Sequence, residues 1–416
     1  MFNLKSAYYY FLATKINITK KLKKVYFRTN FYNNSLKSKV PEQLYFYPNP
    51  FLLSSLTSHK NFSFEVANID TNMFWLKQSN EREEKSLHNF LWLNLINRKS
   101  KDSKIQKIIN VWIHKNGKYK NIVWDSSVIS KRIVSWILNA DIILNNTDSS
   151  FKEDFFKSII LQTNHLKKNI KFENNNYKKI EIISSILLTG LVFKDYSENY
   201  ELGIKDLEKI IEIFFDNEGF PLNRNPNDLI KFSKYFILIK ECIKDAQQFV
   251  PDYLDEIIDK NLKCIKSILT PHKQVPLFNG GTETNLEEYL SYITRLNYKL
   301  SKSQKKIGNL QIIKDKKNCI YFDVGQPPRK NLSSNYQSGP LSFEYFLDGD
   351  KIITNCGFGN SISKKAVLIS KLTSAQSTLS INDSSVVKLE RNKSINNAYG
   401  NSIKTSFKIL EYNFND

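Results

Sequence analysis

Histidine is the side chain that most often moves protons or binds metals near neutral pH. The chain has five histidines, and none of them lies after residue 272: His59, His88, His114, His165 and His272. The last third of the sequence therefore cannot supply a histidine base or a histidine-based metal site. The four cysteines form no Cys-x-x-Cys pair, so neither a zinc site nor a disulfide framework is expected.

Other nucleophile and phosphate motifs are also missing from the sequence. There is no P-loop and no Gly-x-Ser-x-Gly, and Gly357-Phe-Gly359 is not followed by the helical pattern of a dinucleotide site. The sequence therefore offers no motif for a phosphate-binding site or for a serine nucleophile.

The composition is that of a globular, basic protein. With 416 residues, 41% of them hydrophobic, the chain can bury a large core and is expected to hold two domains. A formal charge of +20 favours a partner that is a nucleic acid, an anionic membrane surface or an acidic glycan. The alternative is that part of the lysine excess reflects an AT-rich genome. No stretch reaches the ~18–20 apolar residues of a membrane span.

Residues 1–40 carry eight lysines and one arginine and no acidic residue, interleaved with tyrosine and phenylalanine. This pattern predicts a basic aromatic arm over residues 1–45 that contacts an anionic membrane surface or a partner. The alternative is a solvated helical extension packed on the main domain. The short apolar run at 6–13 lacks the small-residue end of a secretory signal, so no signal peptide is expected.

From residue 81 onward, apolar residues recur at helical spacing. The alternating stretch at 62–76 suggests short strands. The helical patterns predict an α-helical domain over 46–310 built as an (α/α) toroid. The nine helical patterns cover residues 87–96, 105–113, 128–144, 151–166, 180–193, 207–215, 229–243, 254–269 and 286–296.

A basic segment at 301–317 separates this region from a strand-rich one, which predicts an antiparallel β-sandwich over 318–416. Asp348-Gly349 between two alternating runs, at 341–346 and 351–355, is a strong hairpin signal. A further strand is expected at 374–383, ending in an Asn-Asp turn.

Several motifs occur in the order found in one family. The sequence resembles the C-terminal domain of the heparinase II/III-like polysaccharide lyases. The matching residues are Asp323-Val-Gly325, Asn335-Tyr-Gln337-Ser-Gly339-Pro-Leu341-Ser-Phe343, Asn355-Cys-Gly357 and Ala375-Gln376-Ser-Thr378. Motifs of the helical half resemble the alphaproteobacterial branch of the family: Arg132-Ile-Val-Ser-Trp136, Gly190-Leu-Val-Phe193, Asp216-Asn-Glu-Gly-Phe220, Arg224-Asn-Pro226 and Phe278-Asn-Gly-Gly281.

The resemblance implies a toroid followed by a β-sandwich. Because only 91 residues follow Gly325, the sandwich is expected to be incomplete. In the family an Asn-His pair, a Tyr and a His act in β-elimination, and two His and an Asp bind a metal. Here the Asn-His pair falls near Asn176-Tyr177, the Tyr position holds Asp228, and the His-x-His strand reads Asn335-Tyr336-Gln337. The remaining ligand positions hold Asn355 and Gln376, which are neutral amides, so neither a metal nor a cofactor is expected.

Carried over residue by residue, the resemblance implies one polar cleft between the domains. Its expected catalytic residues are Tyr336, Tyr177 and Arg224, and its expected substrate-binding residues are Asn176, Asn225, Asn335, Gln337 and Gln376.

The function implied by the resemblance is a polysaccharide lyase that cleaves an acidic, uronate-containing glycan, such as a glycosaminoglycan, by β-elimination. One alternative is a catalytically inactive glycan-binding or envelope-assembly protein on the same scaffold, and another is a basic adaptor at the membrane surface. The expected partners are an acidic polysaccharide and, through residues 1–40, an anionic membrane; no specific nucleic acid is expected. The family implies a bacterial cell envelope or periplasm, while the lack of a signal peptide keeps a cytoplasmic or membrane-peripheral location open.

Overall fold

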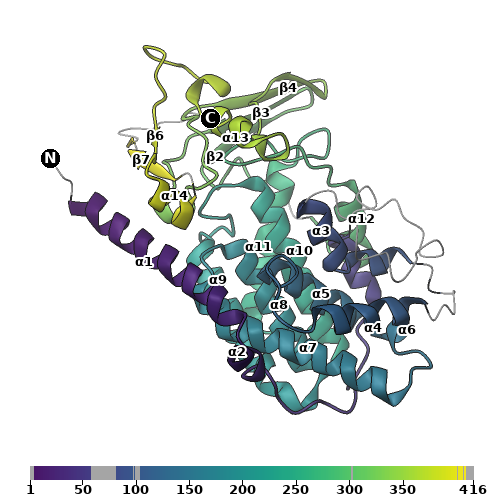
Figure 1. Ribbon diagram of the computed structural model, residues 1–416. Helices are drawn as coiled ribbons and strands as arrows, with labels where there is room; N and C mark the ends of the chain where they lie inside the picture. The colour runs from purple at the N-terminus through teal and green to yellow at the C-terminus, as the bar shows by residue number, and fades with distance from the viewer. Residues whose placement is uncertain are drawn as a thin grey trace. The chain divides into compact units, whose positions relative to one another are not determined.

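The computed structural model describes residues 4–57, 81–96, 98, 104–300, 303–400, 402–405 and 407–408. Helices dominate as far as Arg295 and antiparallel strands dominate beyond it, which confirms the predicted fold class (Figure 1). The chain forms two compact units. The helical unit comprises Lys21–Ile210 and Lys234–Leu254, and the sheet unit comprises Met1–Lys20, Ile211–Ser233 and Asp255–Asp416. The division into an arm, a toroid and a sandwich at 1–45, 46–310 and 318–416 stays a prediction.

Most of the predicted helical stretches are confirmed, but the stretch at 128–144 is divided between two helices and the one at 207–215 begins earlier, at Ser197. The helices are α1 (Leu4–Phe27), α2 (Asn30–Asn34), α3 (Glu81–His88), α4 (Lys104–Asn116), α5 (Ser126–Leu138), α6 (Ala140–Ile143), α7 (Ser149–Asn169), α8 (Asn176–Val192), α9 (Ser197–Phe214), α10 (Pro226–Asp245), α11 (Asp252–Ile268), α12 (Glu287–Arg295), α13 (Lys364–Ile369) and α14 (Lys393–Tyr399).

Side-chain caps define several of the helix starts. Asp125 accepts a hydrogen bond from the Ser127 amide at the start of α5, and Asn175 accepts one from the Lys178 amide at the start of α8. Asp148 does the same for α7. Each cap satisfies an amide that the first helical turn leaves without a partner. These local signals fix where α8 begins, and therefore where Asn176 and Tyr177 lie.

The core of the helical unit is aromatic. Trp136 of α5 lies 5.2–5.3 Å, between ring centroids, from Phe90, Trp112 and Phe155, and all four rings are buried. The predicted helix at 87–96 is interrupted at this point, because Phe90 has a left-handed backbone with φ of 59°. α3 ends at His88, and a 3₁₀ turn follows at Leu91–Leu95. Packing of the Phe90 ring among the tryptophans therefore overrides the helical periodicity of this stretch.

The sheet unit contains a five-stranded antiparallel sheet in the order β1-β2-β3-β4-β5 and a two-stranded sheet of β6 and β7. The strands are β1 (Lys306–Ile307), β2 (Leu310–Lys314), β3 (Asn318–Asp323), β4 (Phe343–Leu347), β5 (Asp350–Ile353), β6 (Lys388–Leu389) and β7 (Ile403–Thr405). The predicted hairpin is confirmed, since Leu347 of β4 pairs with Asp350 of β5 across Asp348-Gly349.

The strand expected at 374–383 is not formed. The segment begins as a 3₁₀ turn at Thr373–Ala375 and continues without ladder pairing to an isolated bridge between Ile381 and Ser384. The expected Asn-Asp turn is present, with positive φ at Asn382 and Asp383. Leu379 and Ile381 are exposed, and no strand among the described residues pairs with this alternating stretch. The strands expected at 62–76 lie outside the described residues.

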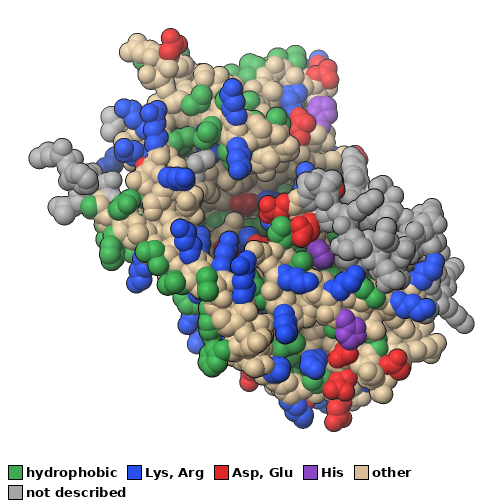
Figure 2. Space-filling model, viewed as in Figure 1, with side chains coloured by type: hydrophobic (Ala, Val, Ile, Leu, Met, Phe, Trp, Pro, Cys, Tyr) green, Lys and Arg blue, Asp and Glu red, His purple; other side chains and the backbone are tan. Residues whose placement is uncertain are grey.

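Basic side chains are spread widely over the visible surface of the protein (Figure 2). Among the residues that the structure describes, no helix combines the length and apolar character needed to cross a membrane.

Candidate functional site

Arg224 lies in the turn between α9 and α10, where its backbone has a φ of 61°. Its side chain is almost fully buried and forms an ion pair with Asp323 at the end of β3. Its second terminal nitrogen donates to the Gln326 carbonyl at 3.1 Å. The Asp323 carboxylate also accepts from the Gly325 amide at 3.0 Å and from Asn279 at 3.2 Å. The positive charge of Arg224 is thus already balanced by a buried carboxylate.

Gly325 explains why an Asp-x-Gly sequence is needed at this point. A side chain at residue 325 would place a Cβ atom 2.4 Å from the Arg224 Cζ atom. Only glycine leaves room for the guanidinium to reach Asp323. This scaffold motif therefore serves to seat Arg224.

Tyr336, the expected proton-transfer residue of the sheet unit, has 1% of its surface exposed. Its hydroxyl has no hydrogen-bond partner among the described residues. Burial and the nearby charge of Asp323 raise the pKa of Tyr336, and Arg224 opposes this effect only in part. A phenol that acts as a base near neutral pH needs the opposite shift. The environment therefore keeps this hydroxyl protonated.

Gln337 and Gln376, which occupy family positions of metal-binding histidines, converge on one backbone oxygen. Their side-chain nitrogens donate to the Ser370 carbonyl at 2.9 Å and 2.8 Å. Gln337 also donates to the Gly357 carbonyl and accepts from the Gly280 amide, at 2.9 Å and 3.0 Å. The two amides thus act as internal hydrogen-bond donors.

Asn355, at the third ligand position, accepts hydrogen bonds from the amide and hydroxyl of Ser377 at 3.0 Å and 3.1 Å. A cation would bind the amide oxygens, because an amide NH₂ group has no free lone pair. The oxygens of Gln337 and Asn355 already accept hydrogen bonds, and all three side chains are neutral, so Gln337, Asn355 and Gln376 do not fit the metal that the family implies. No group of three His, Cys, Asp or Glu side chains in the described part of the chain is placed to hold a metal ion.

The structure brings six of the eight expected site residues into the sheet unit: Arg224, Asn225, Asn335, Tyr336, Gln337 and Gln376. Asn225 is buried and accepts from the Asn227 amide at 2.9 Å at the start of α10. Asn335 is partly exposed and lies against Gly280, as does Asn225. We call these six residues the polar cluster. Most of its side chains are buried and bonded to the protein itself.

The other two expected residues, Asn176 and Tyr177, begin α8 in the helical unit and are half-buried. The Tyr177 ring lies 6.2 Å from the Tyr235 ring, and the Lys131 ammonium lies 5.9 Å from the Tyr177 ring centroid. Lys131 thus lies beside Tyr177, and the same lysine lines a cavity that is described next.

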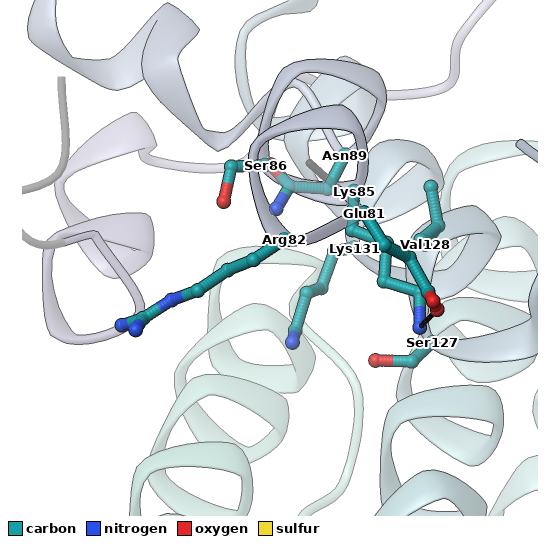
Figure 3. A pocket seen from close by; sticks show the side chains of 8 residues that line it. All are labelled: Glu81, Arg82, Lys85, Ser86, Asn89, Ser127, Val128 and Lys131. Atoms are coloured by element: carbon teal, nitrogen blue, oxygen red, sulfur yellow. Dashed lines mark ion pairs between the residues drawn. The ribbon is translucent and has the colours of Figure 1, made fainter. Parts of the chain in front are cut away.

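This cavity of about 460 Å³ lies in the helical unit between α3 and α5 (Figure 3). Its lining contains three cationic side chains, one acidic side chain, serine, asparagine and one valine. These residues are Glu81, Arg82, Lys85, Ser86, Asn89, Ser127, Val128 and Lys131. Lys85 pairs with Glu81 at 2.6 Å, as the dashed line in Figure 3 shows. Cations next to hydroxyl and amide groups are suited to an anionic sugar.

A buried carboxylate, Glu181, pairs with one of the lysines that line this cavity and was not among the residues expected from the sequence. Glu181 of α8 is fully buried, and one of its oxygens lies 3.0 Å from the Lys131 ammonium and 3.3 Å from the Tyr235 hydroxyl. The only sequence signal for it was a single acid within the apolar run of α8. This ion pair fixes Lys131 at the wall of the cavity.

Comparison with known proteins gives the family of the C-terminal part. Residues 300–405 match the family model described as Heparinase II/III-like, C-terminal. This part of the chain is a heparinase II/III-like domain. The resemblance drawn from the sequence motifs is thereby confirmed.

Known relatives cover the helical region as well. The chain is 20% identical over 330 residues to the FtsZ-localized protein C of Caulobacter vibrioides, which covers 76% of this chain and 55% of the relative. The fold of the present chain is similar to that of the heparan sulfate lyase HepC from Pedobacter heparinus. The TM-score is 0.58 at 16% identity, and the match covers 80% of this chain and 60% of the lyase. A structure of heparinase III gives a TM-score of 0.57 at 16% identity, covering 82% of this chain and 63% of that one. The chain thus spans less than two thirds of each of these proteins.

Proposed function

We propose that this protein uses the heparinase fold to bind an acidic, uronate-containing glycan of the bacterial cell envelope without cleaving it. The observation that supports this best is the state of the polar cluster. The Arg224 charge is balanced by Asp323, the Tyr336 hydroxyl is held protonated, and the amides of Gln337 and Gln376 are bonded to a backbone carbonyl. β-Elimination requires a neutralised carboxylate, a base and an acid, and this cluster offers no group prepared to be the base.

The glycan would bind at the cavity between α3 and α5. Arg82 can pair with a uronate carboxylate, and Lys85 and Lys131 lie beside it although Glu81 and Glu181 pair with them. Ser86 and Asn89 can bond to sugar hydroxyls. The net charge of +20 would draw a polyanion toward the protein over distances of about one Debye length. A relative whose name refers to its localisation with FtsZ is consistent with a non-enzymatic role for this scaffold.

A lyase that acts through Tyr177 is the second candidate. The supporting observation is the Lys131 ammonium, which borders the cavity and lies 5.9 Å from the Tyr177 ring. In that case Tyr177 would transfer the proton, Asn176 would bind the substrate, and Tyr336 and Arg224 would have only structural roles.

One experiment separates the two functions. The purified protein is incubated with a panel of acidic glycans while the ultraviolet absorbance of unsaturated uronate is recorded, and binding is measured by calorimetry. We expect binding without an absorbance rise, and binding weakened about tenfold or more by Arg82→Ala with Lys85→Ala, since each removed charge–carboxylate contact is worth about 1 kcal/mol. Lys107→Ala with Lys157→Ala, two exposed lysines of the same unit, is the matched control.

A sustained absorbance rise would establish the lyase instead. Tyr177→Phe and Tyr336→Phe then identify the acid or base, because the catalytic tyrosine loses turnover and keeps glycan binding. Equal glycan affinity of the wild type and the Arg82 and Lys85 variant would show that the cavity is not the binding site.

A further inference from the structure

The long helix α1 has one face that packs against the protein. Within the sheet unit, Ala13 is buried against Ile395 and Ala398 of α14, and the rings of Tyr9 and Tyr399 meet edge to face at 6.3 Å. Asn17 donates to the Ser394 carbonyl at 2.8 Å. One turn-spaced row of the helix therefore packs on α14 (Figure 1).

The opposite face of α1 carries a row of large apolar side chains that the fold leaves uncovered. These residues recur at intervals of three, four or seven, which places them on one side of the helix. We call them the apolar stripe: Tyr8 (61% exposed), Phe11 (67%), Ile18 (52%), Leu22 (65%) and Val25 (67%). Figure 2 shows apolar and basic side chains along the edge where α1 lies.

The charges of α1 are all of one sign. The helix contains six lysines and no aspartate or glutamate. Lys15 falls within the apolar stripe and Lys21 flanks it, while Lys24 lies further round the helix; all three are exposed. An uncovered apolar row whose only charged neighbours are cations is complementary to a surface that offers both anionic groups and a hydrophobic interior.

We propose that the apolar stripe of α1 docks this protein on an anionic membrane surface. Phe11, Leu22 and Val25 would enter the boundary between head groups and acyl chains, and the lysines would pair with lipid phosphates. The stripe runs along the length of α1, so the helix would lie in the plane of the membrane. A second copy of the chain is a poorer occupant, because two such helices would place their lysines against each other.

Co-sedimentation with vesicles of phosphatidylcholine, with and without phosphatidylglycerol, tests the proposal on the full chain. The wild type should bind only the vesicles that contain phosphatidylglycerol. Phe11→Ser, Leu22→Ser and Val25→Ser together should lower the partition coefficient more than about tenfold, since each side chain buries apolar area in the membrane. The matched control replaces three exposed apolar residues elsewhere: Ile213→Ser, Phe249→Ser and Ile362→Ser.

A second pair of variants tests the charges. Lys21→Glu with Lys24→Glu should reduce binding about tenfold or more, while Lys205→Glu with Lys365→Glu, also exposed, should reduce it much less. Circular dichroism confirms that each variant is folded. Equal binding to neutral vesicles, unchanged binding by the stripe variant, or a wild-type dimer that only the stripe variant dissociates would each overturn the proposal. Loss of glycan binding alone would leave it standing, because the cavity and the stripe share no residue.

Discussion

At the scale of single residues, Arg224 and Asp323 depend on each other. Both side chains are almost completely shielded from water, so each charge is tolerable only while the other is present. The same pair seats Gly325, Gln326 and Asn279 through hydrogen bonds. Removing either partner would leave an uncompensated charge beside the buried Tyr336 hydroxyl.

The first prediction concerns this ion pair. Arg224→Met should lower the free energy of unfolding by about 3–5 kcal/mol, because it leaves Asp323 buried and unpaired. Adding Asp323→Asn should recover part of that loss. The control is Lys209→Met, which removes an exposed pair with Asp206 and should change stability by about 1 kcal/mol or less. Urea unfolding followed by tryptophan fluorescence measures all three variants.

A different outcome would change the role assigned to Arg224 from a structural one to ligand binding. If Arg224→Met unfolds like the wild type but loses affinity for acidic glycans, the guanidinium binds the ligand rather than the protein. The proposed structural role of the polar cluster would then be wrong.

Residue types were predictable from the sequence, but residue roles were not. Arg132 belongs to a motif that helped to suggest the family, and the structure shows it fully buried in the helical unit. Its guanidinium donates to Gln162 at 2.7 Å and to the carbonyl of His88 at 2.8 Å, and stacks 4.2 Å from the Trp112 ring. The motif thus reflects packing. Only the fold reveals this, because these partners are far apart in the sequence.

At the scale of elements, local signals were enough wherever they acted within a few residues. Helix periodicity and capping gave α7, α8 and α10 nearly to their ends, and Asp348-Gly349 gave the β4–β5 hairpin. Prediction failed where a distant partner decides the conformation. The ring of Phe90 breaks a helix by packing on Trp136, and the segment at 374–383 forms no ladder with any strand that the structure describes.

The second prediction concerns the β4–β5 turn. Asp348 and Gly349 have φ values of 48° and 92°, the pattern of a type I′ turn. A Cβ atom on Gly349 would meet nothing within 4 Å, so any loss on substitution comes from the backbone alone. Gly349→Val should therefore lower the free energy of unfolding by about 1–2 kcal/mol. Thermal denaturation of the variants measures this.

Gly349→Asn is the matched control, because asparagine tolerates a left-handed backbone far better than valine does. It should retain most of the stability. Equal losses for valine and asparagine would mean that the side chain itself disturbs a contact, which the open surroundings of Gly349 contradict.

At the scale of the whole molecule, each compact unit is assembled from separate stretches of the chain. In the sequence, the only boundary signal was a change of composition near residue 301. Such a signal can divide the chain only at one position along its length. It cannot show that residues 211–233 belong with the strands that follow them, since that grouping depends on contacts such as the one between Arg224 and Asp323. Six of the residues expected to share a site lie in the sheet unit, and the family order of motifs grouped them in the sequence because it carries such long-range information.

The last prediction concerns the acid stability of the helical unit. His88 and His165 are both buried, and burial lowers the pKa of each to about 3, with Arg132 and Lys120 adding to the effect at His88 and Lys23 at His165. The unfolded chain takes up these protons near pH 6.5, whereas the folded chain does so only near pH 3. The folded state therefore binds fewer protons in this window, and stability falls as the pH is lowered from 6.5 toward 3.

Each of these histidines should remove about 1 kcal/mol of unfolding free energy between pH 7.5 and 5.5, a range in which most carboxylates stay ionised. Urea titrations at several pH values measure the slope. His165→Gln should lower overall stability, because Tyr32 loses its 2.6 Å bond to the imidazole, yet it should flatten the pH dependence by about half. Tyr32→Phe removes the same hydrogen bond but keeps the imidazole, so it should lower stability without flattening the slope. An unchanged slope in His165→Gln would mean that His165 is protonated in the folded protein, and that its burial is not maintained in solution.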